Sequence, residues 1–132
     1  MTENEAGTVV VEEAFNLHRE LGPGLVESVY EIVLANALLG RGLKTSRQRP
    51  VPIQYRGLKF DEGFRRDIWV EEKVILEIKS VEKITPLHKK QLQTYLRLTG
   101  CKLGYLLNFG AALMKEGICR CVNGLEETPP SL

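Results

Sequence analysis

The segment Asp67-Ile-Trp-Val-Glu-Glu-Lys-Val-Ile-Leu-Glu-Ile-Lys79 contains two apolar runs separated by the charged triplet 71–73. Apolar runs joined by a short polar turn are typical of a β-hairpin. Because strand side chains alternate between faces, Glu77 and Lys79 are expected on the same face of the second strand. Ionisable groups on buried strands are costly to desolvate unless they are paired. The segment therefore predicts either a structural ion-pair cluster or a metal site with a lysine beside it.

The spacing also predicts which residues face each other across this hairpin. If residues 71–73 form the turn, Val70 faces Val74, and counting inward places Asp67 opposite Glu77. Directly opposed residues have Cβ atoms roughly 5 Å apart. Two carboxylates at that separation repel each other unless a proton or a cation lies between them. Mg²⁺ is commonly held by one or two carboxylates, waters and substrate phosphate oxygens. This pair is thus a candidate divalent-metal site.

Length and composition favour a single domain. The chain has 132 residues and ordinary apolar and charged content, which suits one hydrophobic core. We expect one domain over residues 1–132, with a core at about 9–123 and a disordered tail at 124–132. No apolar run approaches the roughly 18 residues that span a bilayer, and the acidic N-terminus has no apolar signal core. We therefore expect a cytoplasmic protein with no membrane partner.

Charge is unevenly distributed although the net charge is only +1. Residues 1–40 hold seven acids and one base, whereas residues 41–66 hold eight bases and two acids. A basic segment leading into the acidic pair can attract a polyanion such as a nucleic acid. The alternative is a charged strand edge that resists aggregation. Charge alone favours this second interpretation by about two to one.

The order of predicted elements is α-α-β-β-β-α-β-β. Helices are expected at 9–21 and 25–39, extended segments at 44–55, 58–70 and 73–80, a helix from Thr85-Pro86 to near Gly100, and strands at 103–109 and 118–122. The short crossover from 73–80 to 103–109 predicts parallel neighbouring strands. The result is an α/β domain with a mixed sheet flanked by helices.

Two pairs of polar residues fall at helical spacing. Glu27 and Tyr30 occur in Gly24-x-x-Glu27-x-x-Tyr30, and Gln91 and Tyr95 lie four residues apart. Residues three or four apart share a helix face. The crossover can bring Gln91 and Tyr95 above the carboxyl end of the preceding strand, where ligands bind in many α/β sheets.

These motifs resemble a known group of proteins. Gly24-x-x-Glu27-x-x-Tyr30 is similar to the signature of the GxxExxY protein family, which belongs to the PD-(D/E)XK nuclease superfamily. Gln91-x-x-x-Tyr95 is similar to the QxxxY element of the RecB-like branch of that superfamily. Several motifs in the right order are a far more specific signal than any one of them.

The hairpin completes the resemblance. Asp67 followed by Glu77-Ile78-Lys79 resembles the superfamily's D…(D/E)XK signature. Arg66 precedes Asp67 where the signature has a dispensable proline. The resemblance covers about residues 9–123 and implies a restriction-endonuclease-like core with the order α-β-β-β-α-β.

The resemblance also implies a role for each matching residue. Asp67, Glu77 and the Ile78 carbonyl would bind Mg²⁺ or Mn²⁺, and Glu27 would complete the metal shell directly or through water. Lys79 would orient or help deprotonate the attacking water and stabilise charge on the phosphate.

The helix residues would support this centre. Gln91 and Tyr95 would position the lysine or contact the substrate phosphate, and Tyr30 would support the site. Taken singly, the residues also suit structural roles: Glu27 as a first-turn acid favoured by the helix dipole, and Asp67 in a salt bridge with Arg65 or Lys79.

Two functions follow. The first is a metal-dependent nuclease-like phosphodiesterase that hydrolyses DNA or RNA. The alternative is a non-catalytic nucleic-acid-binding or protein-interaction module that retains the nuclease fold. A homodimer is a further expectation, because a domain this small offers little surface to grip a duplex and closed dimers are the commonest oligomers.

Overall fold

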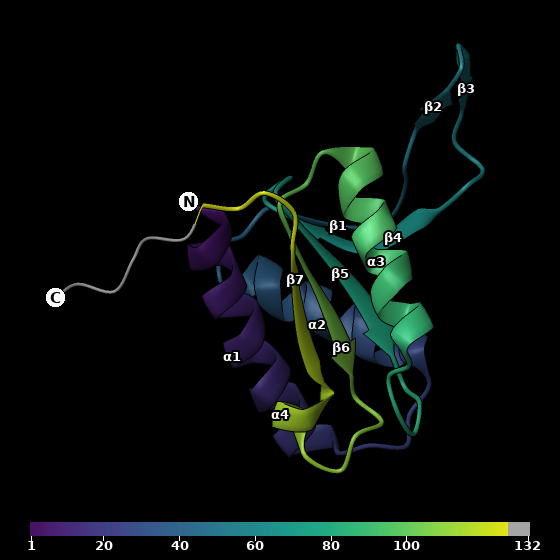
Figure 1. The fold of residues 1–132 in the computed structure, drawn as a ribbon. Coiled ribbons are helices and arrows are strands. Elements are labelled where there is room, and N and C mark those ends of the chain that lie inside the picture. Colours follow the sequence, from purple (N-terminus) through teal and green to yellow (C-terminus); the bar gives the residue numbers. More distant parts are fainter. Residues whose placement is uncertain (127–132) are drawn as a thin grey trace, which may run out of the picture.

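The computed structural model describes residues 1–126 and places a five-stranded mixed sheet between helices (Figure 1). The elements are α1 (Glu3–Leu21), α2 (Glu27–Gly40), β1 (Thr45–Pro50), β2 (Ile53–Tyr55), β3 (Leu58–Phe60), β4 (Arg65–Val70), β5 (Val74–Lys79), α3 (Pro86–Thr99), β6 (Leu103–Asn108), α4 (Met114–Gly117) and β7 (Ile118–Val122). The strand order is β1-β4-β5-β6-β7. The predicted α/β class, with a mixed sheet flanked by helices, is confirmed.

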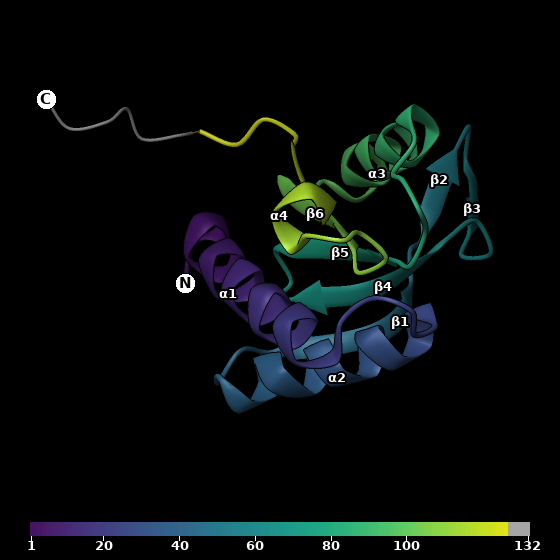
Figure 2. The same cartoon turned by 90° about the horizontal axis from the view of Figure 1, so that it is seen from below.

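The helices cover both faces of this sheet (Figure 2). Helices α1 and α2 pack with one sheet face to form the main core, which includes Leu76 and Ile78 of β5. Helix α3 packs on the other face, where Ile75 of β5 meets Leu92 and Leu96. Strands β5 and β6 are therefore buried on both sides, as expected for the covered centre of an α/β sheet.

Helix caps explain where α1 and α3 begin. The hydroxyl of Thr85 accepts a hydrogen bond from the His88 N–H, and Pro86 occupies the first helical position, as predicted. Helix α1 begins at residue 3 rather than at the predicted residue 9. The reason is a capping box in which Thr2 and Glu5 satisfy each other's backbone N–H groups, which fixes the helix start.

The β4–β5 hairpin has the predicted register. Val70 pairs with Val74 and Ile68 with Leu76, so the next step places Asp67 opposite Glu77. The turn contains two residues with positive φ, Glu71 and Glu72, both at 54°. Paired left-handed residues suit the right-handed twist of the flanking strands. Strands β5 and β6 are parallel neighbours, which confirms the predicted crossover.

The predicted extended segments 44–55 and 58–70 are each divided in two. Only β1 and β4 join the main sheet, while β2 and β3 form a separate two-stranded hairpin that projects past α3 (Figures 1 and 2). Pro50 and Pro52 lie at this division. Because proline has no N–H to donate, it ends a ladder.

The ends of the domain differ from the expected limits. Ala6 is fully buried in the main core, and Leu125 packs against that core at the other end. The rest of the predicted disordered tail, residues 127–132, lies outside the described residues. The short helix α4 lies directly before β7. Among residues 1–126, no helix combines the length and apolarity that crossing a membrane requires.

A glycine in β6 tests the packing of α3 on the sheet. A Cβ at Gly104 would lie 3.1 Å from side-chain atoms of Leu92 and Leu96 and 3.2 Å from the Ile75 carbonyl oxygen. We predict that Gly104→Ala lowers the free energy of unfolding by about 1–3 kcal/mol, measured by urea denaturation. Gly40→Ala is the control, because open space surrounds Gly40 at the end of α2. Equal stability of the two variants would contradict this packing.

Candidate active site

Two carboxyl groups lie side by side on the central strands. One oxygen of Asp67, Oδ2, accepts a hydrogen bond of 2.8 Å from the Ile78 N–H on the neighbouring strand. Glu77 is only 9% exposed, and its Oε1 atom is buried without a hydrogen-bond partner among the described residues. A buried, unsatisfied carboxylate oxygen is costly. It requires a proton, a cation or a ligand.

Burial raises the pKa of both carboxyl groups. Burial raises the pKa of Glu77 to about 9, with the neighbouring Asp67 charge as the second cause. Burial also raises the pKa of Asp67, although the hydrogen bond from Ile78 opposes this shift. The positive charge of Lys79 lowers both pKa values. Without a metal, the pair is therefore expected to retain a proton at neutral pH.

The arrangement is not a salt-bridge cluster. Within residues 1–126, neither Asp67 nor Glu77 takes part in an ion pair. Arg65, one of the partners considered for Asp67, donates instead to the Gln48 carbonyl oxygen at 3.3 Å. Lys79 stands two residues after Glu77 at the end of β5 and is half-buried. Lys79 thus acts on the carboxylates through its field rather than through a close contact.

A third acid, Glu31 on α2, is linked to the pair. Glu31 is 5% exposed and accepts hydrogen bonds from Arg47 (Nε, 2.8 Å; Nη2, 2.6 Å) and from the Gln48 side-chain amide (2.8 Å). The same Gln48 amide lies 3.4 Å from Asp67 Oδ1. The Glu31 charge contributes to the raised pKa of Asp67. Gln48 therefore links Glu31 to the carboxyl pair.

Sequence reasoning missed both of these residues. Glu31 lies one helical turn after Glu27, so extending the helix face from the motif would have found it. Gln48 sits within β1 at a φ of 55°, an unusual conformation for this residue type. No feature of the sequence marks that conformation.

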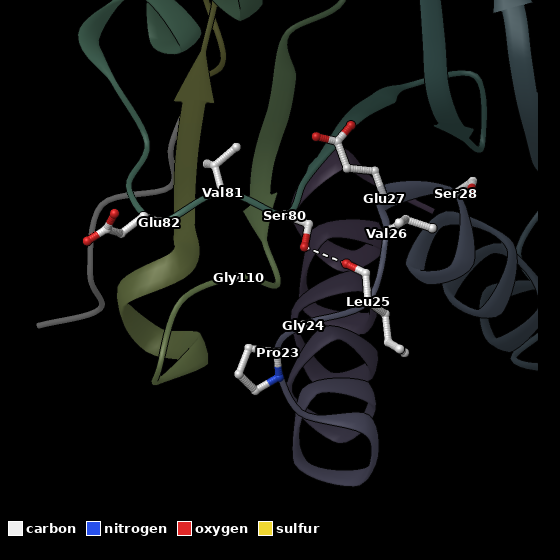
Figure 3. Close-up of a pocket in the computed structure, with 10 residues that line it drawn as sticks. All are labelled: Pro23, Gly24, Leu25, Val26, Glu27, Ser28, Ser80, Val81, Glu82 and Gly110. Atoms are coloured by element: carbon white, nitrogen blue, oxygen red, sulfur yellow. Dashed lines mark hydrogen bonds between the residues drawn. The ribbon is translucent and has the colours of Figure 1, made fainter.

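Glu27 lies at a cavity next to the end of β5. It is exposed at the first residue of α2 and lines a cavity of about 810 Å³ together with Ser80, Glu82 and Gly110 (Figure 3). The Ser80 hydroxyl donates a 2.6 Å hydrogen bond to the Leu25 carbonyl oxygen. The cavity therefore opens directly after Lys79, at the carboxyl end of β5.

Tyr30 holds the loop that leads to Glu27. Its side chain is fully buried and stacks on Phe109 with a centroid separation of 4.6 Å. The hydroxyl donates to the Gly22 carbonyl oxygen at 2.6 Å and accepts from the Leu25 N–H at 3.1 Å. Tyr30 thus fixes the cavity wall, whereas Glu27 is open to solvent.

Helix α3 carries Tyr95, whose hydroxyl interacts electrostatically with the carboxyl pair. Tyr95 is half-buried and stacks on Phe64 with a centroid separation of 3.4 Å and an interplanar angle of 12°. Burial raises the pKa of the Tyr95 hydroxyl, and the charges of Glu77 and Asp67 raise it further. Gln91, one turn earlier, is exposed.

The donor set fits a hard divalent ion that keeps part of its water. Residues 1–126 contain no group of three or more His, Cys, Asp or Glu side chains placed to hold a metal. Two adjacent carboxylates with one unsatisfied buried oxygen are nevertheless present. Mg²⁺ commonly binds through one or two carboxylates and retains several waters. Asp67 and Glu77 therefore suit Mg²⁺ or Mn²⁺.

Comparison with known proteins places the chain. A family model described as the PD-(D/E)XK nuclease superfamily matches residues 4–121. The chain belongs to the PD-(D/E)XK nuclease superfamily. The matched span includes the carboxyl pair and the lysine of this PD-(D/E)XK protein. Searches of curated proteins and of solved structures gave no significant match.

The carboxyl pair of this PD-(D/E)XK protein predicts an unusual pH dependence of stability. The pKa of Glu77 is raised from 4.5 to about 9, so the folded state binds more protons than the unfolded state between these values. Stability without metal should therefore fall as pH rises from about 5 to about 9. Glu77→Gln should remove much of this slope and be more stable than wild type at pH 8 by a few kcal/mol, on the order of the shift at about 1.4 kcal/mol per pH unit.

Urea denaturation in EDTA across this pH range measures the effect. Glu20→Gln is the control, because Glu20 is an exposed acid on α1. Added Mg²⁺ should stabilise wild type at pH 8 but not Glu77→Gln, since only ligands of the native state stabilise it. A wild-type stability that rises steadily toward pH 9 would contradict the assignment.

Proposed function

We propose that this protein is a metal-dependent nuclease that hydrolyses nucleic-acid phosphodiester bonds at Asp67, Glu77 and Lys79. The buried Glu77 oxygen without a partner carries the proposal, because it lies against a second carboxylate and on the same strand face as a lysine. A structural cluster would have paired these charges. Membership of a nuclease superfamily supplies the reaction class.

Each residue has a proposed task. Asp67, Glu77 and the Ile78 carbonyl would hold Mg²⁺ or Mn²⁺, which polarises a phosphoryl oxygen and lowers the pKa of bound water. The Lys79 ammonium would orient the attacking water and balance the negative charge that develops on the phosphate. Tyr95, whose hydroxyl interacts electrostatically with both carboxylates, would position the lysine or the substrate.

The helix acids complete the site. Glu31 would hold Asp67 in place through Gln48, whose amide contacts both acids. Glu27 would supply an outer ligand through water from the rim of the cavity that it lines. Gln91, exposed on α3, is available to a substrate phosphate.

We also assign the protein to the GxxExxY family and to the RecB-like branch as finer proposals. Tyr30 supports the first, because it anchors the loop before Glu27. The position of Tyr95 beside the carboxyl pair supports the second. The basic segment 41–66 supports a nucleic-acid substrate, since it contains β1 and the start of β4, the strand that carries Asp67. One catalytic domain spans the chain in this proposal.

A binding module without turnover is the second candidate. The observation that favours it is the ligand set: residues 1–126 bring no third Asp, Glu, His or Cys into coordinating position. Salt-dependent nucleic-acid binding without cleavage would support this candidate. A homodimer stays a separate prediction, which light scattering tests.

Loss of the lysine or of the aspartate should abolish cleavage. We predict that Lys79→Ala and Asp67→Ala each lower Mg²⁺- or Mn²⁺-dependent cleavage by at least about 100-fold, the usual loss when a stabilising group is removed from a transition state. The assay uses single-stranded, double-stranded and branched DNA and RNA. Lys102→Ala is the control, because Lys102 is exposed at the other end of the sheet. Wild-type protein that leaves every substrate intact would refute the nuclease proposal.

The two acids of α2 can be ranked by isosteric substitution. We predict that Glu31→Gln raises the metal concentration for half-maximal cleavage by about 10–100-fold, as the loss of supporting partners of a metal ligand does. Glu27→Gln should have a smaller effect, since Glu27 is exposed and would act through water. Titrating Mn²⁺ against cleavage rate for both variants gives the ranking. A larger increase in this metal concentration for Glu27→Gln than for Glu31→Gln would assign the main supporting role to Glu27.

A further inference from the structure

The β2–β3 hairpin is the one paired element in the described residues that lies outside the main sheet. It forms its own two-stranded sheet and projects beyond α3 (Figures 1 and 2). A lone two-stranded hairpin is marginally stable in water. The hairpin therefore depends on contacts beyond its own two strands.

The hairpin has one apolar face that is uncovered at the tip. Register pairs Ile53 with Phe60 and Tyr55 with Leu58, and residues two apart on a strand share a face. Near the base, Ile53 and Phe60 are partly buried. At the tip, Tyr55 is 63% exposed and Leu58 is 65% exposed. An aromatic and an aliphatic side chain are thus presented together to solvent.

The tip is also basic. The hairpin residues 53–60 contain Arg56 and Lys59 and no acid. The Arg56 guanidinium lies over the Tyr55 ring, 5.3 Å from its centroid. Arg49 on β1 and Arg65 on β4 are exposed near the hairpin base. The exposed acids Asp61 and Glu62 follow the hairpin directly, so its positive charge is concentrated at the tip. The charge at the tip complements a polyanion, whereas two such tips brought together would repel.

The base of the hairpin is connected to the region of the carboxyl pair through Phe64 and Tyr95. The Val51 N–H donates a 3.0 Å hydrogen bond to the Phe64 carbonyl oxygen, which closes the hairpin at its base. The Phe64 ring stacks on Tyr95, and Tyr95 lies within the field of Glu77 and Asp67. A strand bound along the hairpin would therefore lead toward the proposed catalytic site.

We propose that the β2–β3 hairpin is a nucleic-acid-binding finger that stacks an unpaired base of the substrate strand on Tyr55 and Leu58, while Arg56 and Lys59 hold the flanking phosphates. Bases stack on exposed aromatic side chains irrespective of sequence, and cations contribute salt-dependent phosphate binding. The inference rests on the proposed nuclease function, because it names how the substrate of that site is held.

Fluorescence anisotropy in EDTA tests the finger without any need for turnover. The probes are one labelled single-stranded oligonucleotide, as DNA and as RNA, and the matching duplex DNA. Tyr55→Leu should weaken single-strand binding by about tenfold, because stacking is lost, whereas Tyr55→Phe should bind like wild type. Arg56→Gln with Lys59→Gln should lower the salt dependence of binding. The duplex should lose less affinity than the single strand in Tyr55→Leu.

Matched controls separate the finger from general surface effects. Ile32→Ala removes another exposed apolar side chain, on α2 (51% exposed, against 63% for Tyr55), and Lys102→Gln removes a distant charge. Both should bind like wild type. Because Tyr55→Leu and Tyr55→Phe both keep a large apolar residue on the hairpin, a difference between them reports the ring rather than folding of the hairpin.

Three results would overturn the inference. The first is equal oligonucleotide affinity of Tyr55→Leu and wild type, and the second is an equal loss of affinity in Tyr55→Leu and Ile32→Ala. The third is a Tyr55→Leu protein whose mass in sedimentation differs from that of wild type while its oligonucleotide affinity is unaltered. That result would make a second copy of the chain the partner of the hairpin. Hairpin-dependent binding without metal-dependent cleavage would sink the nuclease proposal alone. Cleavage with hairpin-independent binding would sink the finger alone.

Discussion

Two adjacent carboxyl groups held together in a buried place are the constraint on which the site depends. Asp67 and Glu77 lie on adjacent strands at the covered centre of the sheet, where water cannot solvate them fully. Asp67 is compensated by the Ile78 N–H, but Glu77 Oε1 has no hydrogen-bond partner among the described residues. Helices on both faces hold these strands rigidly, so the carboxylates cannot separate to relieve the repulsion. The fold thereby creates a requirement for positive charge at one point.

The surroundings of the pair are arranged to keep its geometry. Gln48 adopts a left-handed φ of 55° inside a strand, which costs roughly 1–2 kcal/mol for a residue other than glycine. Its amide reaches Glu31 and Asp67 from this conformation. Backbone strain of this kind persists only where neighbouring contacts over-determine it, and such residues cluster at functional sites. Arg47 holds Glu31 through a hydrogen bond and an ion pair, so that a helix and an edge strand both support Asp67.

Local sequence patterns predicted the strand register and the start of α3, whereas features that depend on long-range packing could not be predicted. Alternation and turn residues predicted the register that places Asp67 opposite Glu77, and Thr85-Pro86 predicted the start of α3. Helix α1 is longer than predicted, because the capping box of Thr2 and Glu5 begins it before the apolar periodicity does. The conformation of Gln48 could not be predicted, because glutamine has no intrinsic preference for positive φ. The choice between Glu27 and Glu31 also depends on how α2 rotates against the sheet, which tertiary contacts decide.

In a domain this small, the proposed catalytic residues and the proposed substrate-binding surface lie on different elements. Helices cover both faces of the sheet, so a polymeric substrate of the proposed nuclease would approach the carboxyl pair past the end of β5 or along the edge strand β1. Lys79 and the cavity beside Ser80 lie on the first route, and they offer little surface for binding a polymer. The chain between β1 and β4, which starts and ends next to the pair, is the part of the basic segment that extends outward from the body. A projecting hairpin with an exposed ring and cations supplies binding area there without enlarging the core. The charged residues of the sheet would then catalyse the reaction, and the hairpin would bind the substrate.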